Sequence, residues 1–481
     1  MKNIVATLII LHNIESLFHA RQLLPHKDDL VHPSLSLQIY EAVHNFLAKY
    51  PNLRILMDMD KILFYIKKII PRSVLNQLRP LYHYGLSYIG SLVYRHPSRH
   101  LTVIAVTGTK GKSTVTELIT HILEADGKKV ASLSTIQFKV GENVRRNLYK
   151  MTMPGRFFVQ KFLREAVDAG CTHAVVEMTS EGAKQFRHRF MEIDALVFTN
   201  LSPEHIESHG SFEKYKMAKL QLAVAVANSP KRPRILVANI DDEHGQDFLD
   251  FEVEKILPYS LDDLSLYTLH RDNMSLIIDD TTLRIPLVGL FNVYNTLAAI
   301  TLTRALGVSL KTIEQALHEL PPIRGRVEHF YSPKSAEKAV TAIVDYAHTP
   351  DSLTQLYKAF SDVPKICILG NTGGGRDTWK RPEMGSIAEK YCDQIILTNE
   401  DPYDENPRAI VDSMAKGITD QSKLEIIMDR RLAIRTALEK APDGGYVLIS
   451  GKGTDPYIMG PNNTKQVWSD AEVVQEELAK L

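Results

Sequence analysis

The sequence predicts an α/β protein in which two domains with mostly parallel sheets follow a mainly helical N-terminal segment. Three observations support this prediction. Apolar strand patterns alternate with helix-length amphipathic stretches from Leu101 onward, and a second alternation of this kind follows Gly325. Residues 1–98 show long amphipathic stretches instead. Alternating strands and helices favour a parallel sheet that is covered by helices on both faces.

Length and composition agree with this division. A chain of 481 residues exceeds what a single core usually holds, so we expect three parts, residues 1–98, 99–322 and 323–481. Hydrophobic residues make up 44% and charged residues 24%, which is typical of a globular protein. Because 57 basic residues balance 57 acidic ones, nucleic acid is not an expected partner. We expect the chain to act as a monomer.

In the N-terminal segment, helical patterns cover residues 36–50 and 80–94. The apolar run Ile4–Leu11 follows a single lysine and lacks a small-residue cleavage site, so we interpret it as a buried element rather than a signal peptide. No run approaches the roughly 18–20 apolar residues of a membrane-spanning helix, and we expect a cytoplasmic protein.

Short apolar runs predict the strands of the two larger domains. Those of the central domain are expected at Val103–Thr107, Ala174–Met178, Ala195–Thr199 and Ile235–Ala238. Residues 259–286 are rich in β-type and turn residues and predict a small antiparallel piece. Those of the C-terminal domain are expected at Ala342–Asp345, Ile366–Gly370, Gln394–Thr398, Leu424–Met428 and Tyr446–Ser450. Helix-length segments separate these five strands, which predicts a Rossmann-like, doubly wound domain.

The three cysteines, Cys171, Cys367 and Cys392, are scattered and lie beside apolar strand-like runs. We interpret them as small buried thiols rather than as metal ligands or a disulfide framework. This interpretation fits a reducing compartment.

The strongest local signal is a glycine- and lysine-rich loop between the first central strand and a helix expected from Lys112 to about Ala125. Glycines let the backbone wrap phosphates, the helix N-terminus favours an anion, the lysine adds a point charge and the serine offers a hydroxyl to Mg²⁺. The loop predicts a P-loop ATPase site formed by Gly108, Thr109, Lys110, Gly111, Lys112, Ser113 and Thr114. The full pattern would have glycine at Val106. The strand–loop–helix context still argues against the alternative of a plain turn with a solvated lysine.

Two further strands are followed by polar residues. Glu177 ends an apolar strand and could complete a Mg²⁺ shell, although a carboxylate in this position is often structural. His205 follows the strand that ends near Thr199, and Lys219 lies fourteen residues further on. A lone histidine is usually structural, but the neighbouring phosphate loop favours a functional role for this one.

Together these motifs resemble the Mur ligases, ATP-dependent enzymes that join amino acids to carboxylates of cell-wall precursors. The shared motifs are Thr107–Ser113, Glu177–Ser180, Thr199–His205, Tyr215–Lys219, Gly289–Asn295, Arg324–Glu328 and Val344–Asp351. The last of these, with Gly373–Asp377 and Lys380–Pro382, is most similar to the MurE branch, the UDP-N-acetylmuramyl-tripeptide synthetases. The resemblance runs in order from about Leu101 to Asp470.

The resemblance implies a role for each of a set of residues. The implied catalytic residues are Lys112, Lys219, His205 and Arg326, and Lys219 would carry a carbamate formed with CO₂. The implied Mg²⁺ ligands are Ser113, Glu177, His205 and Lys219. Besides the phosphate loop, the implied ATP contacts are Asn292, Asn295, Arg326 and Asp345. The implied contacts to the sugar-peptide acceptor and the amino acid are Thr152, Pro154, Thr179, Ser180, His348, Arg376, Asp401, Tyr403, Asp404, Gly451 and Asp455.

The charges of the reactants explain this set of residues. The acceptor carboxylate and ATP are both anions, so two Mg²⁺ ions, Lys112 and Arg326 would neutralise charge while the carboxylate takes the γ-phosphate. The amine of the amino acid would then attack the acyl phosphate and give an amide, ADP and phosphate. ATP and the amino acid would bind to different domains, which suggests closure before chemistry.

Two departures from the family concern the substrates. Diaminopimelate-specific members have Asp-Asn-Pro-Arg where this chain has Glu400–Tyr403, and the family's Gly-Lys-Gly-His-Glu appears as Gly451–Asp455. Carboxylates without an arginine suit a side-chain ammonium, so we expect lysine or ornithine rather than diaminopimelate. Arg408 or Lys452 could reverse this preference by folding into the site.

The second departure is the segment 1–98, which does not match the family's usual uridine-diphosphate-binding domain. Residues 61–99 contain seven Lys or Arg and no Asp or Glu. This composition predicts a surface for a diphosphate sugar or for an anionic membrane. An equally supported alternative is that amphipathic helices pack on the ATPase domain and expose basic faces to solvent.

Other functions share parts of the same pattern. Folylpolyglutamate synthases, cyanophycin synthetases and pseudomurein-type peptide ligases are Mur-like ligases, but the Asp345–Asp351 string favours the cell-wall branch. A nucleotide-binding protein without ligase activity is the remaining alternative. The joint presence of the implied catalytic residues argues against it.

Overall fold

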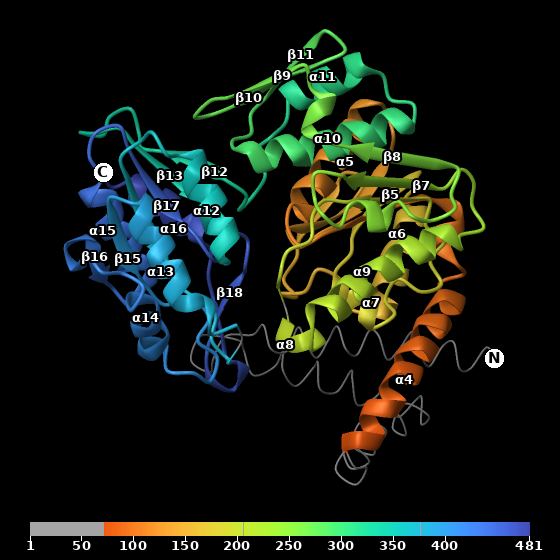
Figure 1. Cartoon of the computed structure of the whole chain (residues 1–481), viewed down its shortest axis with the longest axis horizontal. Helices are drawn as coiled ribbons and strands as arrows, with labels where there is room; N and C mark the ends of the chain where they lie inside the picture. The colour runs from red at the N-terminus through yellow and green to blue at the C-terminus, as the bar shows by residue number, and fades with distance from the viewer. Residues whose placement is uncertain (1–71, 205, 376) are drawn as a thin grey trace, which may run out of the picture. The chain divides into compact units, whose positions relative to one another are not determined.

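The computed structural model describes residues 72–204, 206–375 and 377–481, whose helices and strands are drawn in Figure 1. The chain divides into two compact units, residues 1–85 and 86–481. In the first unit the described part is the beginning of α4 (Arg72–Val93), so the helix expected at 80–94 is confirmed. The elements expected at 4–11 and 36–50, as well as His205 and Arg376, lie outside the described residues.

The second unit begins with the last turns of α4. Ser87 donates a hydrogen bond to the carbonyl oxygen of Phe186 (2.8 Å), and the rings of Tyr88 and Phe190 lie 5.1 Å apart. The short 3₁₀ helix η1 (Pro97–His100) then leads into the first strand. This end of the basic segment therefore packs on the loop 185–191, as the packing alternative predicted.

An eight-stranded sheet forms the core of what we call the central lobe. Its spatial order is β4-β3-β2-β5-β1-β6-β7-β8, parallel from β2 to β8. The strands are β1 (Thr102–Thr107), β2 (Val130–Leu133), β3 (Gln137–Val140), β4 (Asn143–Arg146), β5 (His173–Glu177), β6 (Ala195–Phe198), β7 (Ile235–Asn239) and β8 (Lys255–Tyr259). All four strands predicted for this part are confirmed. The strands β2, β3, β4 and β8 were not predicted, because they are short or mix polar and apolar residues.

Helices cover both faces of this sheet. Along β1, Ile104 and Val106 pack into one core while Val103 and Ala105 pack into the other, as the period-two geometry of a strand requires. The first core contains α5 (Lys112–Ala125), α10 (Leu290–Ala305) and α11 (Leu310–His318); the second contains α6 (Arg156–Asp168) and α9 (Phe212–Ala227). Shorter elements are α7 (Ser180–Lys184), α8 (Ile206–His209), η2 (Gln246–Phe248) and η3 (Leu261–Asp263).

The antiparallel piece expected within 259–286 is confirmed as a three-stranded sheet. Its strands are β9 (Leu266–Leu269), β10 (Met274–Ile278) and β11 (Thr281–Ile285). The buried side chains of β10 and β11 join the same core as α5 and α11.

A six-stranded sheet forms the C-terminal lobe, in the order β12-β13-β17-β14-β15-β16. The strands are β12 (Glu328–Tyr331), β13 (Val340–Val344), β14 (Lys365–Leu369), β15 (Gln394–Leu397), β16 (Leu424–Ile426) and β17 (Gly445–Ile449). One face packs on α12 (Pro350–Ala359), α13 (Lys380–Tyr391) and α14 (Pro407–Ala415), and the other on α15 (Arg430–Lys440) and α16 (Asp470–Leu478). Only β12 is antiparallel, so the predicted doubly wound arrangement is confirmed among the described residues. The remaining elements are η4 (Gln421–Lys423), β18 (Tyr457–Met459), η5 (Pro461–Asn463) and β19 (Lys465–Val467).

Two of the cysteines form a disulfide, so the prediction of three free thiols is wrong. Cys367 lies in β14 and Cys392 directly follows α13, with Cα atoms 6.0 Å apart. The helix α13 returns the chain to the start of the neighbouring strand, which brings residues 25 positions apart into one buried core. Sequence spacing does not reveal this proximity, and cysteine content no longer argues for a reducing compartment. Cys171 is a free buried cysteine, as expected.

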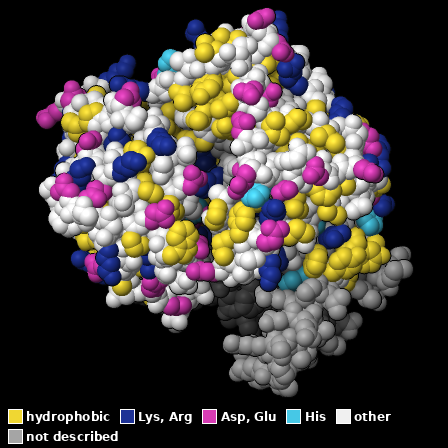
Figure 2. Space-filling view, viewed as in Figure 1, with side chains coloured by type: hydrophobic (Ala, Val, Ile, Leu, Met, Phe, Trp, Pro, Cys, Tyr) yellow, Lys and Arg dark blue, Asp and Glu magenta, His cyan; other side chains and the backbone are white. Residues whose placement is uncertain are grey.

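Within the described ranges, no helix combines the length and the apolar composition needed to cross a bilayer. Figure 2 shows basic and acidic side chains interspersed over the face in view. This mixture is what equal numbers of the two charges led us to expect.

Candidate active site

A cavity of about 830 Å³ opens where the parallel strands of the central lobe end. The central lobe lines it with the phosphate loop, Glu177 at the end of β5, and Asn295 from α10. The C-terminal lobe adds Arg326, Asp345 and Asp455. Side chains that were predicted to bind ATP, metal and substrate from separate parts of the sequence therefore meet in one cavity.

The phosphate loop adopts a conformation that depends on its glycines. Gly108 and Gly111 have φ values of 148° and 80°, in the region that favours glycine. A Cβ at position 111 would lie 2.2 Å from Oδ1 of Asn295. Gly111 directly precedes α5, whose unpaired N-terminal amides attract an anion. This geometry fits a nucleotide phosphate.

Lys112 turns its ammonium back onto this loop. Its Nζ donates hydrogen bonds to the carbonyl oxygens of Gly108 (3.1 Å) and Thr109 (2.7 Å). Burial lowers the pKa of Lys112, although Glu177 and Glu204 oppose this effect. A phosphate in the loop would give the ammonium a charged acceptor in place of neutral carbonyls.

Lys219, on α9, shares one of these carbonyl oxygens. Its side chain is 1% exposed, and its Nζ donates to the oxygen of Gly108 at 2.6 Å. The amine also lies 4.8 Å from the ring centroid of Tyr215. Burial and then the neighbouring Lys112 hold the pKa of Lys219 well below its usual value. Because Lys112 and Lys219 share the carbonyl oxygen of Gly108, two ammonium groups there would repel each other. This repulsion favours an uncharged Lys219, which is the form that can react with CO₂.

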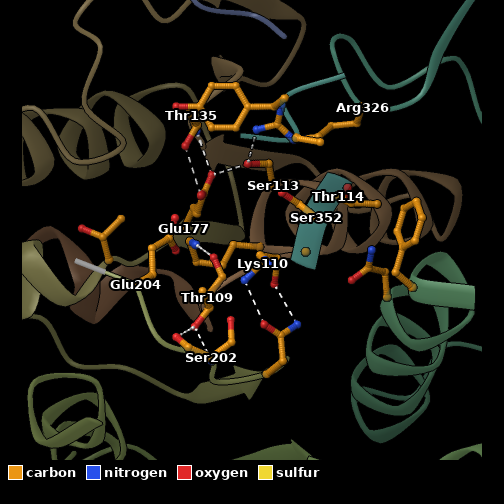
Figure 3. A pocket seen from close by; sticks show the side chains of 18 of the residues that line it. Thr109, Lys110, Ser113, Thr114, Thr135, Glu177, Ser202, Glu204, Arg326 and Ser352 are labelled. Carbon is orange, nitrogen blue, oxygen red and sulfur yellow. Dashed lines mark hydrogen bonds between the residues drawn. The ribbon is translucent and has the colours of Figure 1, made fainter. Parts of the chain in front are cut away.

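Glu177 is the carboxylate of the site (Figure 3). Its Oε2 accepts hydrogen bonds from the hydroxyl of Ser113 (2.9 Å) and the amide of Thr135 (2.8 Å), while its Oε1 accepts one from the Thr135 hydroxyl (3.1 Å). A carboxylate beside a serine hydroxyl fits Mg²⁺, which takes one or two carboxylates together with phosphate oxygens and water. Across the described residues, no three His, Cys, Asp or Glu side chains form a metal-binding group. Thr135 was not singled out, although it follows a parallel strand just as Glu177 does.

The segment after β6 supports the phosphate loop. Asn200 accepts a hydrogen bond from the amide of Lys110 (2.9 Å), and the Thr199 hydroxyl donates to the Lys110 carbonyl (2.6 Å). Glu204 lies 3.3 Å from Nε2 of His348, so this segment also contacts the C-terminal lobe. Part of the Thr199–His205 motif therefore shapes the loop.

Asn292 and Asn295 lie on consecutive turns of α10 and both line the cavity. Nδ2 of Asn295 donates to Oδ1 of Asn292 (3.0 Å), and Nδ2 of Asn292 donates to the carbonyl oxygen of Val288 (2.9 Å). The carboxylate of Asp345 accepts hydrogen bonds from the backbone amides of Val327 (2.8 Å) and Ala347 (2.7 Å). Burial raises the pKa of Asp345. These three nucleotide-binding candidates are thus held rigidly.

Arg326 reaches the phosphate loop from the C-terminal lobe (Figure 3). Its Nη2 donates to the hydroxyl of Ser113 at 3.3 Å, and its guanidinium carbon lies 4.7 Å from the ring centroid of Tyr346. Stacking on an aromatic ring restrains the guanidinium without neutralising it. The site therefore holds cations from both lobes near Ser113.

The predicted acceptor residues only partly reach the cavity. Thr152, Thr179 and Ser180 line it, whereas Pro154 does not. The hydroxyls of Thr152 and Thr135 lie 2.7 Å apart. Two residues that were not predicted, Gln185 and Arg187, line the same wall. Their sequence signal was a polar stretch that continues past Ser180 beyond the short helix α7.

Of the predicted amino-acid contacts, His348 and Asp455 line the cavity, whereas Asp401, Tyr403, Asp404 and Gly451 do not. Asp401 is 3% exposed and binds Lys150 (2.5 Å) and Lys452 (2.9 Å). Asp455 faces the same two lysines at 3.0 and 3.5 Å. These two carboxylates are therefore neutralised within the protein, which removes one argument for a substrate ammonium beside them.

Comparison with known proteins identifies the family. Residues 106–303 match the Mur ligase middle domain, and residues 325–453 match the Mur ligase glutamate ligase domain. Over 430 residues the chain is 35% identical to a UDP-N-acetylmuramyl-tripeptide synthetase of Roseiflexus sp. (strain RS-1), with 82% of each chain covered. The chain belongs to the Mur ligase family.

Further relatives agree. This Mur ligase is 32% identical over 409 residues to a UDP-N-acetylmuramoyl-L-alanyl-D-glutamate--2,6-diaminopimelate ligase of Halalkalibacterium halodurans, again with 82% of each chain covered. A solved structure of a ligase with that name has a TM-score of 0.55 at 29% identity and covers 82% of both chains. MurF from Acinetobacter baumannii has a TM-score of 0.61 at 18% identity, covers 83% of this chain and 81% of its own, and shows the shared fold. These relatives are ligases by name, which confirms the ATP-dependent ligase activity expected from the sequence.

Proposed function

We propose that this Mur ligase adds an amino acid to a muramyl-peptide acceptor of peptidoglycan synthesis and converts ATP to ADP and phosphate. The observation that carries the proposal is the single cavity in which the phosphate loop, Glu177, Thr152 and Asp455 meet. The names of the two relatives described above support this class of acceptor.

In the proposed reaction, the residues of the chain neutralise and orient the reactants. Lys112 and Arg326 approach the phosphates from different lobes and offset the charge that develops as the acceptor carboxylate takes up the γ-phosphate. Ser113 and Glu177 would hold Mg²⁺, which supplies further charge neutralisation when bound. Closure of the two lobes over the cavity would keep water from the acyl phosphate until the amine of the amino acid displaces phosphate.

We also propose that Lys219 is carbamylated. The neutral amine attacks CO₂, a C–N bond forms, and one proton leaves to solvent. The product is an anion beside Lys112, so an attractive pair replaces two amines that share the Gly108 carbonyl. The carbamate would join Glu177 and His205 as a Mg²⁺ ligand.

For the amino acid, we propose lysine or ornithine in preference to diaminopimelate. Tyr403 stands where diaminopimelate-specific members have arginine, and it brings no positive charge. Neither of the two possible substitutes is free: Arg408 pairs with Asp412 on α14, and Lys452 is fully buried against Asp401.

The remaining proposals concern the whole chain. We propose domain boundaries near residues 99 and 323, a cytoplasmic monomer, and a basic segment 61–99 that contacts the diphosphate of the acceptor or an anionic membrane. Composition alone supports this last role, and residues 61–71 lie outside the described part of the chain.

Product mass tests the proposed function most directly. Purified full-length protein is incubated with ATP, Mg²⁺, UDP-muramyl-dipeptide and mixed amino acids, and each component is omitted in turn. The proposal expects one new amide product and phosphate release that requires both the acceptor and an amino acid. If an amide product forms only with a folate or another carboxylate acceptor, the enzyme belongs to a different branch of Mur-like ligases. Phosphate release without either substrate would contradict the ligase proposal.

A further inference from the structure

Lys150 connects the two lobes at the wall of the cavity. It lies two residues before Thr152, in the loop that enters α6, whereas Asp401 and Asp455 belong to loops of the C-terminal lobe. Its Nζ lies 2.5 Å from Oδ2 of Asp401 and 3.0 Å from Oδ2 of Asp455. The side chains of the lysine and the two aspartates are 17%, 5% and 13% exposed, so water screens these ion pairs far less than a surface pair.

Contacts within the C-terminal lobe hold the Asp401 carboxylate that binds this lysine. Lys452 binds Oδ1 of Asp401 (2.9 Å) and the carbonyl of Tyr457 (2.5 Å), and the amide of Met459 donates to the same Oδ1 (2.8 Å). Oδ2 of Asp401 is left to face Lys150. Contacts within the C-terminal lobe therefore orient this carboxylate toward the central lobe.

In the central lobe, the backbone of Lys150 adopts an uncommon conformation at this contact. Lys150 has a φ of 49°, a left-handed conformation that costs a non-glycine residue free energy unless other contacts stabilise it. Two residues on, the hydroxyl of Thr152 lies 2.7 Å from that of Thr135, which in turn donates to Glu177. A continuous series of contacts thus links Asp455 to the predicted metal ligand.

We infer that Lys150 is a positioning residue that holds the Thr152 loop against the C-terminal lobe while the two lobes are closed on the substrates. The inference rests on the proposed function and adds a specific consequence to it. Without Lys150, the acyl phosphate still forms in the central lobe, but the loop no longer excludes water. Water then attacks the acyl carbon, the C–O bond to phosphate breaks, and the acceptor carboxylate is regenerated with release of phosphate. ATP is consumed without amide formation.

The test compares amide formed with phosphate released in full-length Lys150→Met and Lys150→Arg proteins. In Lys150→Met we expect the amide rate to fall about ten-fold or more, as when one partner of a buried pair is removed. The ratio of phosphate to amide should rise by a similar factor, about ten-fold, because the acyl phosphate still forms and water hydrolyses it. Lys150→Arg keeps the charge and should retain most of the coupling.

A matched control is a solvent-exposed ion pair between the lobes, Arg146 with Glu472 at 2.7 Å, whose side chains are 56% and 55% exposed. Because exposed pairs contribute little, Arg146→Gln should change either rate by less than about two-fold. If Lys150→Met does not fold, Asp455→Asn removes one partner and is measured in the same way.

Either of two kinetic results for folded Lys150→Met overturns the inference: unchanged rates, or an equal loss of amide and phosphate at a constant ratio. If the wild-type protein forms no amide with any acceptor, the proposed function fails while the inference is still tested. Hydrogen exchange of residues 147–154, in full-length protein with a non-hydrolysable ATP analogue, should be faster in Lys150→Met than in wild type. Equal exchange in the two proteins would also overturn it.

Discussion

At the scale of single residues, Lys112 is the most direct test of the phosphate loop. Lys112→Ala removes the fixed positive charge closest to the loop carbonyls, and we expect ligation to fall roughly 100- to 1,000-fold, or about 3–4 kcal/mol of transition-state stabilisation. The measurement is kcat for amide formation at saturating substrates. Lys139→Ala is the control, because Lys139 pairs with Glu124 away from the cavity (2.6 Å). Turnover within a few-fold of the wild type would contradict the assignment of this loop.

Lys219 gives a second prediction at this scale. Lys219→Ala should lose ligation, because neither the amine nor a carbamate remains beside Lys112. A short-chain carboxylic acid added to the assay should restore part of the activity by supplying the missing carboxylate. Gentle mass spectrometry of the wild-type protein at neutral pH should show an added CO₂ that is lost on acidification. Absence of both the rescue and the added mass would count against the carbamate.

At the scale of elements, α5 contains a buried carboxyl group that the proposed reaction does not use. Burial raises the pKa of Glu117 to about 7, although Ser134 and Gln137 donate hydrogen bonds that lower it. Folding therefore favours the protonated form, and its contribution to stability is fully present below pH 4.5, the ordinary value. That contribution, about 3 kcal/mol, is lost as the pH rises through 7.

Glu117→Gln should remove this pH dependence. We expect the variant to be more stable than wild type above pH 7 and to show little advantage near pH 4.5, as measured by denaturant unfolding at both pH values. Glu213→Gln on the exposed surface of α9 is the control, since its side chain is 66% exposed. If the free energy of unfolding depends on pH in the same way in Glu117→Gln and in wild type, the pKa of Glu117 is not raised by folding.

The elements also show what the sequence could predict. Each parallel strand of the central lobe that was predicted is an apolar run buried on both faces, as β1 is, and such runs are visible without a structure. Strand β4, with four exposed residues, is not visible in this way. Glu177 was found because it ends such a strand. Its partner Thr135 and the bridging Lys150 were not, because their roles arise from contacts between segments distant in sequence.

At the scale of the whole molecule, we expect the central lobe to bind ATP and the C-terminal lobe to select the amino acid. We expect lysine or ornithine to be incorporated in preference to meso-diaminopimelate when the three compete at equal concentration. The reason is that a distal carboxylate would be buried without an arginine at position 403, at a cost of several kcal/mol, roughly. Product masses from the mixture give the measurement, and a dominant diaminopimelate product would show that another cation serves the distal carboxylate.

Strand β4 has a consequence for how molecules of this protein meet one another. Among the described residues it is the edge strand of the eight-stranded sheet, and the backbone groups of such an edge could add a strand from a second molecule. All four of its residues are exposed, and two of them are the arginines 145 and 146, which pair with Glu165 and Glu472. Charges on an edge strand discourage edge-to-edge aggregation, since an incoming strand would have to strip water and counterions from them. Replacing both arginines with valine would leave the cavity as it is and make the protein prone to form β-aggregates.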